Sequence, residues 1–451
     1  MSQFKAGFAR TNITPPMGVY INGYYLDRYV EGVLDELEAN AVAFECDGKK
    51  AVVIALDLMA IKRYSVSGES GMDKLRAAVS RATGLAMDSI LLHCTHTHVA
   101  PAVLCDHSDP DFDKYFMGQV ASAAVYALQD LKPAKVGWAI SSAPDISFVR
   151  RFRMKDGSVC TNPGIGNPDI VAPIGDVDER LYVVRMVREG GDEIVIANFG
   201  THPDTVGGSK VTADWPGFAR RTLEKTLPNV KAVVLNGVQG DVNHIKVTAR
   251  DGDFNGIDPN GFDGVGRGYE HAAHMGRVVA GGVLQVYTKV NFIDVQELKC
   301  AEMAVELPSN MPTAEQLKLA YKYIEFHEAG RDCDIPYEGM ELTTVVAESL
   351  RMKRLEHGPE KFIMKLTAIA FGPVVILGIP GEPFTGIGRG IKAASKYPVT
   401  MACCLTNGNE GYFPMQEAYD EGGYEARSSN FKAGVAEQLV EDSLKLINEI
   451  L

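Results

Sequence analysis

The sequence of 451 residues has no long hydrophobic run. No window approaches the roughly 18 continuous apolar residues that a transmembrane helix requires. The N-terminal stretch MSQFKAGFARTNITPPMG also lacks the apolar segment of about 7–15 residues that follows a basic start in a secretory signal. We therefore expect a cytoplasmic protein without stable membrane association.

Paired cysteines are also missing. The eight cysteines are scattered at positions 46, 94, 105, 160, 300, 333, 403 and 404, and no two of them form a CxxC pair. Many structural zinc sites are built from such pairs. Their absence predicts reduced, mostly buried thiols, as is usual for a cytoplasmic protein.

Basic residues are fewer than acidic residues. The chain has 58 acidic and 45 basic residues, which gives a formal net charge of −13. Such a chain is a poor partner for nucleic acid or for an anionic membrane. Two short basic stretches, FVRRFRMK (148–155) and LRMKRLEHGPEK (350–361), are expected to form local salt bridges or to bind substrate. We expect a small-molecule substrate, and the sequence does not predict an oligomeric state.

Repeats and low-complexity linkers are absent, and apolar runs alternate with amphipathic segments along the chain. This alternation is typical of an α/β fold. We expect one domain over residues 1–451, with a helical arm at about 305–360 that begins at a Thr313–Gln316 capping box. Strands are predicted at 51–61, 89–95, 181–187, 193–199, 232–238, 374–379 and 398–405. Helices are predicted at 70–84, 113–131, 271–290, 311–330 and 344–358.

Polar side chains that can bind metals or transfer protons follow several of these predicted strands. They are His96 and His98, His202, Asp241 and Asn243, Glu382, and Tyr412. Ligands of α/β proteins bind where strands end, because the loops there carry polar side chains over an apolar floor. We therefore predict that these strand ends converge on one site.

The stretch THTHVAP (95–101) is the strongest local signal. In an extended segment His96 and His98 lie on one face, so both imidazoles can reach one ion or one substrate. Imidazole suits zinc, although an isolated pair of histidines can also simply hydrogen-bond a loop. His93 faces away and is expected either in the core or behind the ligand histidines, in contact with them but not with the ion. Covalent catalysis by Cys94 is an alternative, but no GxSxG nucleophile motif is visible.

Two aspartates near the predicted site have structural alternatives. Asp57 follows the first long strand and could orient a ligand histidine or cap a helix. Asp214 precedes Pro216 at a predicted helix start, so we expect it to be an N-cap.

The motifs GFARTNITPPMG, LLHCTHTHVAP, FGTHPDTVGG, VQGDVN, GIPGEPF and TNGNEGYFP occur in the order found in one family. With them the chain resembles the N-terminal catalytic region of the neutral/alkaline non-lysosomal ceramidases over nearly its whole length. The resemblance implies stacked mixed β-sheets flanked by helices and a zinc-dependent amide hydrolase. It also implies four zinc ligands, namely His96, His202, Glu382 and Tyr412. His98 would contact the reacting group, and Arg150 would bind the substrate oxygen, with Arg151 and Arg153 as alternatives.

The chain departs from this family at three places. Asn243 stands where the family has a serine, and we expect neither the family's C-terminal immunoglobulin-like domain nor its signal sequence. We therefore expect a zinc-dependent hydrolase that uses metal-activated water on an amide or related bond of a small polar or sugar-derived substrate. The alternatives are a metal-dependent lyase or isomerase of sugar-like substrates, a ceramidase proper, and a non-catalytic metal-binding protein.

Overall fold

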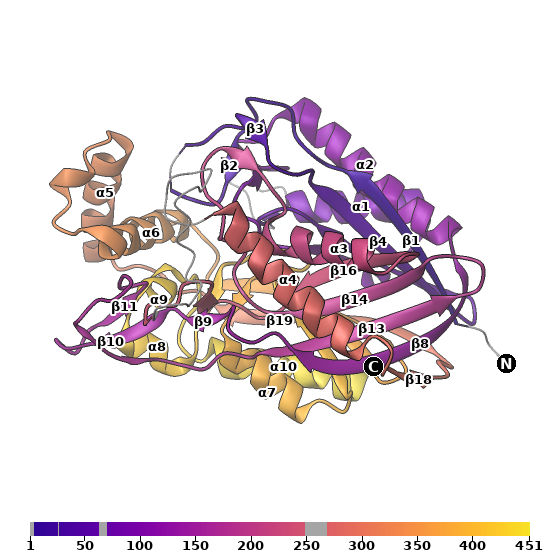
Figure 1. Ribbon diagram of the computed structural model, residues 1–451. Coiled ribbons are helices and arrows are strands. Elements are labelled where there is room, and N and C mark those ends of the chain that lie inside the picture. Colours follow the sequence, from indigo (N-terminus) through magenta and orange to yellow (C-terminus); the bar gives the residue numbers. More distant parts are fainter. Residues whose placement is uncertain (1–3, 26, 63–69, 249–267) are drawn as a thin grey trace.

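The computed structural model describes residues 4–25, 27–62, 70–248 and 268–451. Two stacked β-sheets form the centre of the molecule, and helices cover the outer face of each sheet (Figure 1). The predicted α/β fold with stacked mixed sheets and flanking helices is therefore confirmed. No helix among the described residues is long and apolar enough to cross a membrane.

Within the described residues, the larger sheet has nine strands in the order β16-β14-β13-β8-β1-β4-β5-β6, and β18 also pairs with β8. Its strands are β1 (Lys5–Asn12), β4 (Glu38–Cys46), β5 (Lys49–Leu56), β6 (Ile90–Cys94), β8 (Lys132–Ser142), β13 (Arg180–Arg188), β14 (Glu193–Phe199), β16 (Val230–Asn236) and β18 (Asn291–Ile293). The smaller sheet has the order β19-β20-β21-β23, with β19 (Leu298–Pro308), β20 (Lys361–Phe371), β21 (Val374–Gly378) and β23 (Val399–Cys403).

Short strands make local pairs around these sheets. They are β2 (Ile21–Asn22), β3 (Gly32–Val33), β7 (Ala100–Pro101), β9 (Phe148–Val149), β10 (Arg151–Met154), β11 (Val159–Thr161), β12 (Ile170–Pro173), β15 (Lys210–Val211), β17 (Val242–Asn243), β22 (Glu382–Pro383) and β24 (Tyr412–Phe413). The helices are α1 (Gly71–Thr83), α2 (Pro110–Gln129), α3 (Asp214–Thr226), α4 (Tyr269–Val286), α5 (Ala314–Glu328), α6 (Gly339–Leu355), α7 (Thr385–Ala394), α8 (Gln416–Glu421), α9 (Tyr424–Ser428) and α10 (Val435–Lys445).

The main core lies between the two sheets. Phe44 of the larger sheet and Phe371 of the smaller one meet there with their ring centroids 4.8 Å apart. Helices α1 and α2 cover one half of the larger sheet, α3 and α4 cover the other half, and α7 and α10 cover the smaller sheet. Strand β5 is buried on both faces from Ala51 to Leu56. This explains why its sequence is a continuous apolar run and does not alternate.

The larger sheet consists of two halves that are joined at one narrow point. Strands β1 and β8 pair only through Lys5 with Pro133 and Ala6 with Lys132, so each strand leaves this junction in its own direction. The parallel pairs β5–β6 and β14–β16 both run away from the junction. The two halves therefore send the carboxyl ends of β6, β14 and β16 toward the same end of the molecule.

At that end the two edges of the sheet meet. The backbone N–H of Asn236, the last residue of β16, donates to Nε2 of His93 on β6 at 2.8 Å. The Nδ1 of His93 contacts the carbonyl oxygen of Cys404, just beyond β23, at 2.9 Å. A carbonyl can only accept, so Nδ1 carries the hydrogen and Nε2 is the acceptor. His93 is thus a buried histidine that connects three strand ends, and burial lowers its pKa to about 3.

The ends of several elements follow signals in the local sequence. Helix α1 begins at the Ser70 cap and ends at Gly84, whose φ of 74° is left-handed. The predicted capping box at Thr313 and Gln316 is present at the start of α5. The strand predicted at 51–61 ends at Leu56. The next residue, Asp57, leaves the strand and forms an ion pair with Arg220.

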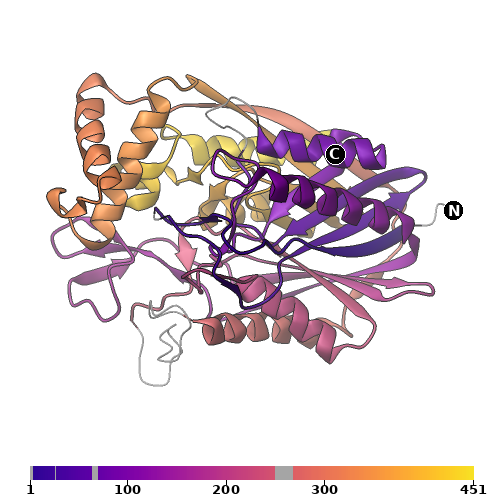
Figure 2. The same ribbon diagram turned by 90° about the horizontal axis from the view of Figure 1, so that it is seen from above.

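Helices α5 and α6 lie between the paired strands β19 and β20 in the chain, and we call this insertion the helical arm. The arm begins after Pro308, because residues 305–308 still belong to β19. Figure 2 shows the two helices projecting at the end of the molecule opposite the start of β1. Arg427 of α9 holds α6 through ion pairs with Glu348 at 2.6 Å and Glu341 at 2.5 Å. The arm is thereby fixed beside the strand ends described above.

A buried ion pair fastens α3 to the end of β5. Arg220 lies 2.6 Å from Asp57, and the two side chains are 1% and 0% exposed. Asp57 therefore neither orients a histidine nor caps a helix. We expect Arg220→Ala to lower the free energy of unfolding by about 3–5 kcal/mol, because it leaves a buried carboxylate without its partner. Urea denaturation monitored by circular dichroism measures this loss.

The matched control for that variant is Lys155→Ala. It breaks an ion pair with Asp169 whose side chains are 63% and 65% exposed. We expect this variant to lower the free energy of unfolding by only about 0–1 kcal/mol, because water screens exposed ion pairs. Equal losses for the two variants would contradict a special role for the buried pair.

Candidate metal centre

Three buried histidines converge at the carboxyl ends of β6 and β14. The Nε2 atom of His96 lies 3.2 Å from Nε2 of His202 and 3.3 Å from Nε2 of His98. Among the described residues this is the one group of three or more histidine, cysteine or acidic side chains that could hold a metal ion. The predicted meeting of the β6 and β14 ends is thus present in the structure.

The backbone of His96 is left-handed, with φ at 80°. A non-glycine residue in this region stores about 1–3 kcal/mol of strain, which persists only where the surroundings impose it. Here the N–H of His96 donates to the carbonyl oxygen of Leu58 at 2.8 Å, and its ring Nδ1 contacts the carbonyl oxygen of Met59 at 2.9 Å. The segment after β5 therefore fixes both the turn and the ring of His96.

His202 is oriented in the same manner by the segment after β16. Its Nδ1 contacts the carbonyl oxygen of Gln239 at 3.1 Å. Burial, with the charge of Arg150 as a second cause, lowers the pKa of His202 to about 4, so the ring is neutral at pH 7. In a neutral imidazole the carbonyl contact places the hydrogen on Nδ1, so Nε2 presents a lone pair to the centre.

Glu382 completes the cluster from the smaller sheet. Its Oε2 lies 3.3 Å from Nε2 of His96 and 3.3 Å from Nε2 of His202, and no donor hydrogen-bonds to it. Burial would raise the pKa of Glu382, but the two histidines lower it well below its ordinary value. When both rings are neutral, with the hydrogen on Nδ1, the carboxylate oxygen and the two Nε2 atoms point lone pairs at one another. Such a set fits a cation, and nitrogen and oxygen donors are those that zinc accepts.

Close backbone packing sets the position of Glu382. The N–H of Gly240 donates to the carbonyl oxygen of Pro383 at 2.9 Å. A Cβ on Gly240 would lie 2.4 Å from the carbonyl oxygen of Glu382, so a larger residue would push the carboxylate away. The glycine of the VQGDVN motif is therefore required for the approach of these two segments.

Tyr412 stands directly opposite Glu382. Strands β22 and β24 pair in parallel with these two residues in register, so their side chains leave the same face. Burial and the charge of Glu382 raise the pKa of the Tyr412 phenol well above its ordinary value, while Arg150 opposes them. The guanidinium carbon of Arg150 lies 5.4 Å from the centroid of the Tyr412 ring.

The structure distinguishes the three candidate arginines. Only Arg150 lies against Tyr412, where it also donates to the carbonyl oxygen of Gly240 at 2.7 Å. Its Nε lies 2.7 Å from Oε1 of the fully buried Glu425. Arg151 and Arg153 turn away to form ion pairs with Glu421 at 3.2 Å and 2.7 Å.

His98 has surroundings unlike those of His96 and His202. Its Nδ1 faces the Asp204 carboxylate at 3.7 Å and makes no contact with a carbonyl oxygen. The hydroxyl of Tyr24 hydrogen-bonds the same carboxylate, and Arg28 donates to the His98 carbonyl oxygen at 2.8 Å. Burial lowers the pKa of His98 to about 3. His98 is thus a neutral ring beside an acid, as in pairs that move protons.

Two strand-end residues from the sequence prediction have structural contacts instead. Asp241 accepts hydrogen bonds from the backbone and the hydroxyl of Thr385 at 2.7 Å and 3.0 Å, and so caps α7. Asn243 donates to Asn162 at 2.8 Å and lies in β17. Both side chains are buried and hold loops next to the centre.

The structure also tests the expected N-cap at Asp214 and the alternative of covalent catalysis by Cys94. Asp214 is not an N-cap, because Ala213 precedes α3 and the Asp214 carboxylate accepts from the backbone of Thr205 and Val206. Burial raises the pKa of Cys94 to about 12, which argues against a thiolate nucleophile. All eight cysteines lie in the described residues, and each is a thiol outside any disulfide.

Tyr424 and Tyr25 were not identified from the sequence. The Tyr424 ring lies 5.7 Å from the Tyr412 ring, and its hydroxyl is 3.0 Å from that of Tyr25. The two residues come from segments 399 positions apart, so no local pattern connects them. Glu425 was missed for the same reason.

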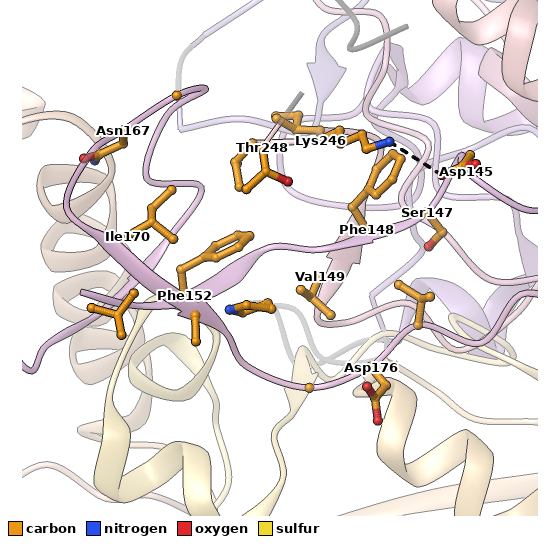
Figure 3. A pocket seen from close by; sticks show the side chains of 18 of the residues that line it. Asp145, Ser147, Phe148, Val149, Phe152, Asn167, Ile170, Asp176, Lys246 and Thr248 are labelled. Atoms are coloured by element: carbon orange, nitrogen blue, oxygen red, sulfur yellow. Dashed lines mark ion pairs between the residues drawn. The ribbon is translucent and has the colours of Figure 1, made fainter. Parts of the chain in front are cut away.

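A separate cavity of about 710 Å³ lies beside β9, β10 and β12 (Figure 3). It is lined mainly by apolar side chains, including Phe148, Val149 and Phe152, and Lys246 pairs with Asp145 at its edge at 3.6 Å. None of the clustered histidines, Glu382 or Tyr412 lines it. This cavity is therefore distinct from the candidate metal centre.

Comparison with solved structures identifies the fold. No protein-family model and no curated protein matches the chain by sequence. The neutral ceramidase from Pseudomonas aeruginosa superposes with a TM-score of 0.72 at 15% identity, covering 99% of this chain and 75% of that one. A ceramidase complexed with C2 gives 0.70 at 14% identity, covering 100% and 76%. The resemblance predicted from the motifs is thus confirmed at the level of structure, and the chain has the neutral ceramidase fold.

Proposed function

We propose that the protein is a zinc-dependent hydrolase that cleaves an amide or related bond of a small polar or sugar-derived substrate. One observation carries the proposal most strongly: Nε2 of His96 and His202 and Oε2 of Glu382 converge within 3.3 Å with no donor between them. The likeness to two ceramidases supports hydrolysis as the reaction class.

In this proposal His96, His202, Glu382 and Tyr412 hold the zinc ion. When bound, zinc lowers the pKa of a water molecule to about 7 and polarises a carbonyl group. The protein supplies two fixed imidazoles, because the carbonyl oxygens of Met59 and Gln239 orient their rings. It also supplies a carboxylate, which reduces the net charge of the site.

His98 moves the proton in this proposal. Its Nδ1 is directed at Asp204, so Nε2 faces the centre and can take a proton from water and later give it to the leaving group. Asp204 would stabilise the ring while it is charged, as a carboxylate near an imidazole raises its basicity. Asp204 is itself held by the hydroxyl of Tyr24.

Arg150 binds the substrate oxygen on which negative charge develops. A guanidinium is charged at every pH relevant to the protein, and at a buried site it stabilises an oxyanion more strongly than in water. Its Nε is occupied by Glu425 and one Nη by Gly240, which fix its direction. No serine is required, so Asn243 at the place of the family serine is compatible with water as the nucleophile.

A ceramidase proper is the second candidate, favoured by the names of the two similar structures. The experiment for both is metal analysis of the purified full chain, followed by hydrolysis in ¹⁸O-labelled water. We expect about one zinc ion per chain and one labelled oxygen in the acid product. A product without the label would indicate a lyase or an isomerase. A zinc-loaded protein that turns over no amide, ester or ceramide would count against both hydrolase candidates and leave the lyase or isomerase and the non-catalytic alternatives.

A further inference from the structure

The short helix α9 contacts both the helical arm and the candidate metal centre. It packs against α6 of the arm and against β24, the strand that begins with Tyr412 (Figure 1). The helix has only five residues, and so short a helix is not stable by itself. Its position therefore depends on the side-chain contacts that hold it at each of these two neighbours.

Glu425 makes the contact with the centre. Its Oε1 lies 2.7 Å from Nε of Arg150, and its Oε2 accepts from the hydroxyl of Thr161 at 2.8 Å. The side chains of Glu425 and Arg150 are 0% and 6% exposed. A buried charge that loses its partner is strongly unfavourable, so the guanidinium of Arg150 must follow the carboxylate of Glu425.

Arg427, two residues further along α9, makes the contact with the arm. It donates from Nε and Nη2 to Oε2 of Glu348 at 2.9 Å and 2.6 Å, and from Nη1 to Glu341 at 2.5 Å. Glu341 and Glu348 lie about two turns apart on α6, so one guanidinium bridges two turns of that helix. Arg354 of α6 adds a hydrogen bond to the side chain of Asn430 at 2.6 Å, just beyond α9.

Other contacts hold the two ends of α9. Arg151 donates to the carbonyl oxygen of Gly422 at 3.0 Å, and the hydroxyl of Ser429 donates to the carbonyl oxygen of Tyr412 at 2.9 Å. Loss of the arm contact should therefore shift α9 and leave it folded. Because Glu425 and Arg427 belong to the same turn of helix, such a shift moves the carboxylate that directs Arg150.

From this chain of contacts we propose that Arg427 is a positioning residue for Arg150. By holding α9 on the arm, it keeps Glu425 where its carboxylate directs the Arg150 guanidinium toward the substrate oxygen. The link from Arg150 to catalysis rests on the proposed function, whereas the link from Arg427 to Arg150 does not. The helical arm is then part of the support of the site.

Arg427→Gln tests the proposal, with N-butyryl-4-nitroaniline as the amide. We expect the variant to keep its zinc and its KM while kcat falls about ten-fold or more, because a small displacement of Arg150 weakens an interaction made in the transition state. Glu348→Gln removes the same ion pair from the side of the arm and should give a fall of the same kind. Unchanged kcat in both variants would overturn the proposal.

Arg331→Gln is the matched control. Arg331 also pairs with two carboxylates, Glu325 at 3.6 Å and Asp334 at 3.5 Å, but both of these belong to the arm itself. We expect this variant to keep the kcat of the wild type. An equal fall in the control and in Arg427→Gln would show a general effect of the arm on stability and would contradict positioning through α9. Thermal unfolding verifies that every variant is folded.

A measurement without turnover separates this proposal from the proposed function. The ¹⁵N–¹H signal of Arg150 Nε, assigned by its disappearance in Arg150→Lys, reports how fast this buried hydrogen exchanges with solvent. We expect exchange to be at least about ten-fold faster in Arg427→Gln and unchanged in Arg331→Gln, because a displaced Glu425 no longer covers the Nε–H group. Equal exchange in Arg427→Gln and the wild type would overturn the proposal, even if kcat falls. Faster exchange in a protein that hydrolyses no amide would support the positioning role and count against the proposed function.

Discussion

Replacing His96 or His202 by alanine is expected to remove zinc from the protein and to abolish hydrolysis. Each variant deletes one nitrogen from a cluster in which the ligand atoms lie within 3.3 Å of each other. Loss of an outer partner typically weakens metal binding 10–100-fold, so loss of a ligand should weaken it by more than about 100-fold. Metal analysis after dialysis and a competition titration with a chelator measure the change. Turnover should fall in parallel.

His357→Ala is the control for both variants. His357 is on the exposed side of the arm, and its side chain is 89% exposed. We expect it to keep zinc and activity. If His96→Ala and His202→Ala retain a full complement of zinc, the four-residue ligand set is wrong, whatever happens to turnover. Unfolding curves for the alanine variants distinguish loss of the ion from loss of the fold.

His98→Ala is expected to separate metal binding from catalysis. The proposal makes His98 a proton-transfer group, so the variant should keep zinc while kcat falls about 10²–10⁴-fold, the range for loss of a general acid or base. The alternative follows from the same geometry, because Nε2 of His98 also lies 3.3 Å from Nε2 of His96. If His98 is a third histidine ligand, its replacement removes zinc as well.

Asp204→Asn refines that test. Asparagine keeps the shape of the side chain that receives the Tyr24 hydroxyl, but it removes the charge that faces Nδ1 of His98. A fall in kcat without loss of zinc or a change in KM would support a positioning role for Asp204. Unchanged kcat would contradict the proposed His98–Asp204 pair.

Local signals in the sequence predicted local structure well. Gly84 ends α1 and the Thr313–Gln316 box begins α5, because capping depends on residues three or four positions apart. The α/β class followed from alternating apolar and amphipathic segments. The helical arm could be located because its two helices are contiguous in the chain.

Predictions for aspartates and arginines were less complete, because their roles depend on distant partners. Asp57 pairs with Arg220, 163 positions away, and so could not be assigned from its own neighbourhood. The resemblance favoured Arg150 as the substrate-binding arginine and left Arg151 and Arg153 as alternatives. The structure distinguishes them, since one lies beside Tyr412 and two pair with Glu421.

The sequence by itself determined which residues are available for the site. The order of the motifs singled out His96, His98, His202, Glu382 and Tyr412, and each follows or begins a short strand. Tertiary structure alone decided that they meet. Strands β1 and β8 pair through only two residues each, and the outer strands β6 and β16 meet again where Asn236 donates to His93. This closure places His96, after β6, beside His202, after β14. Such pairing is long-range and depends on the packing of both sheets, so no periodicity in the sequence reports it.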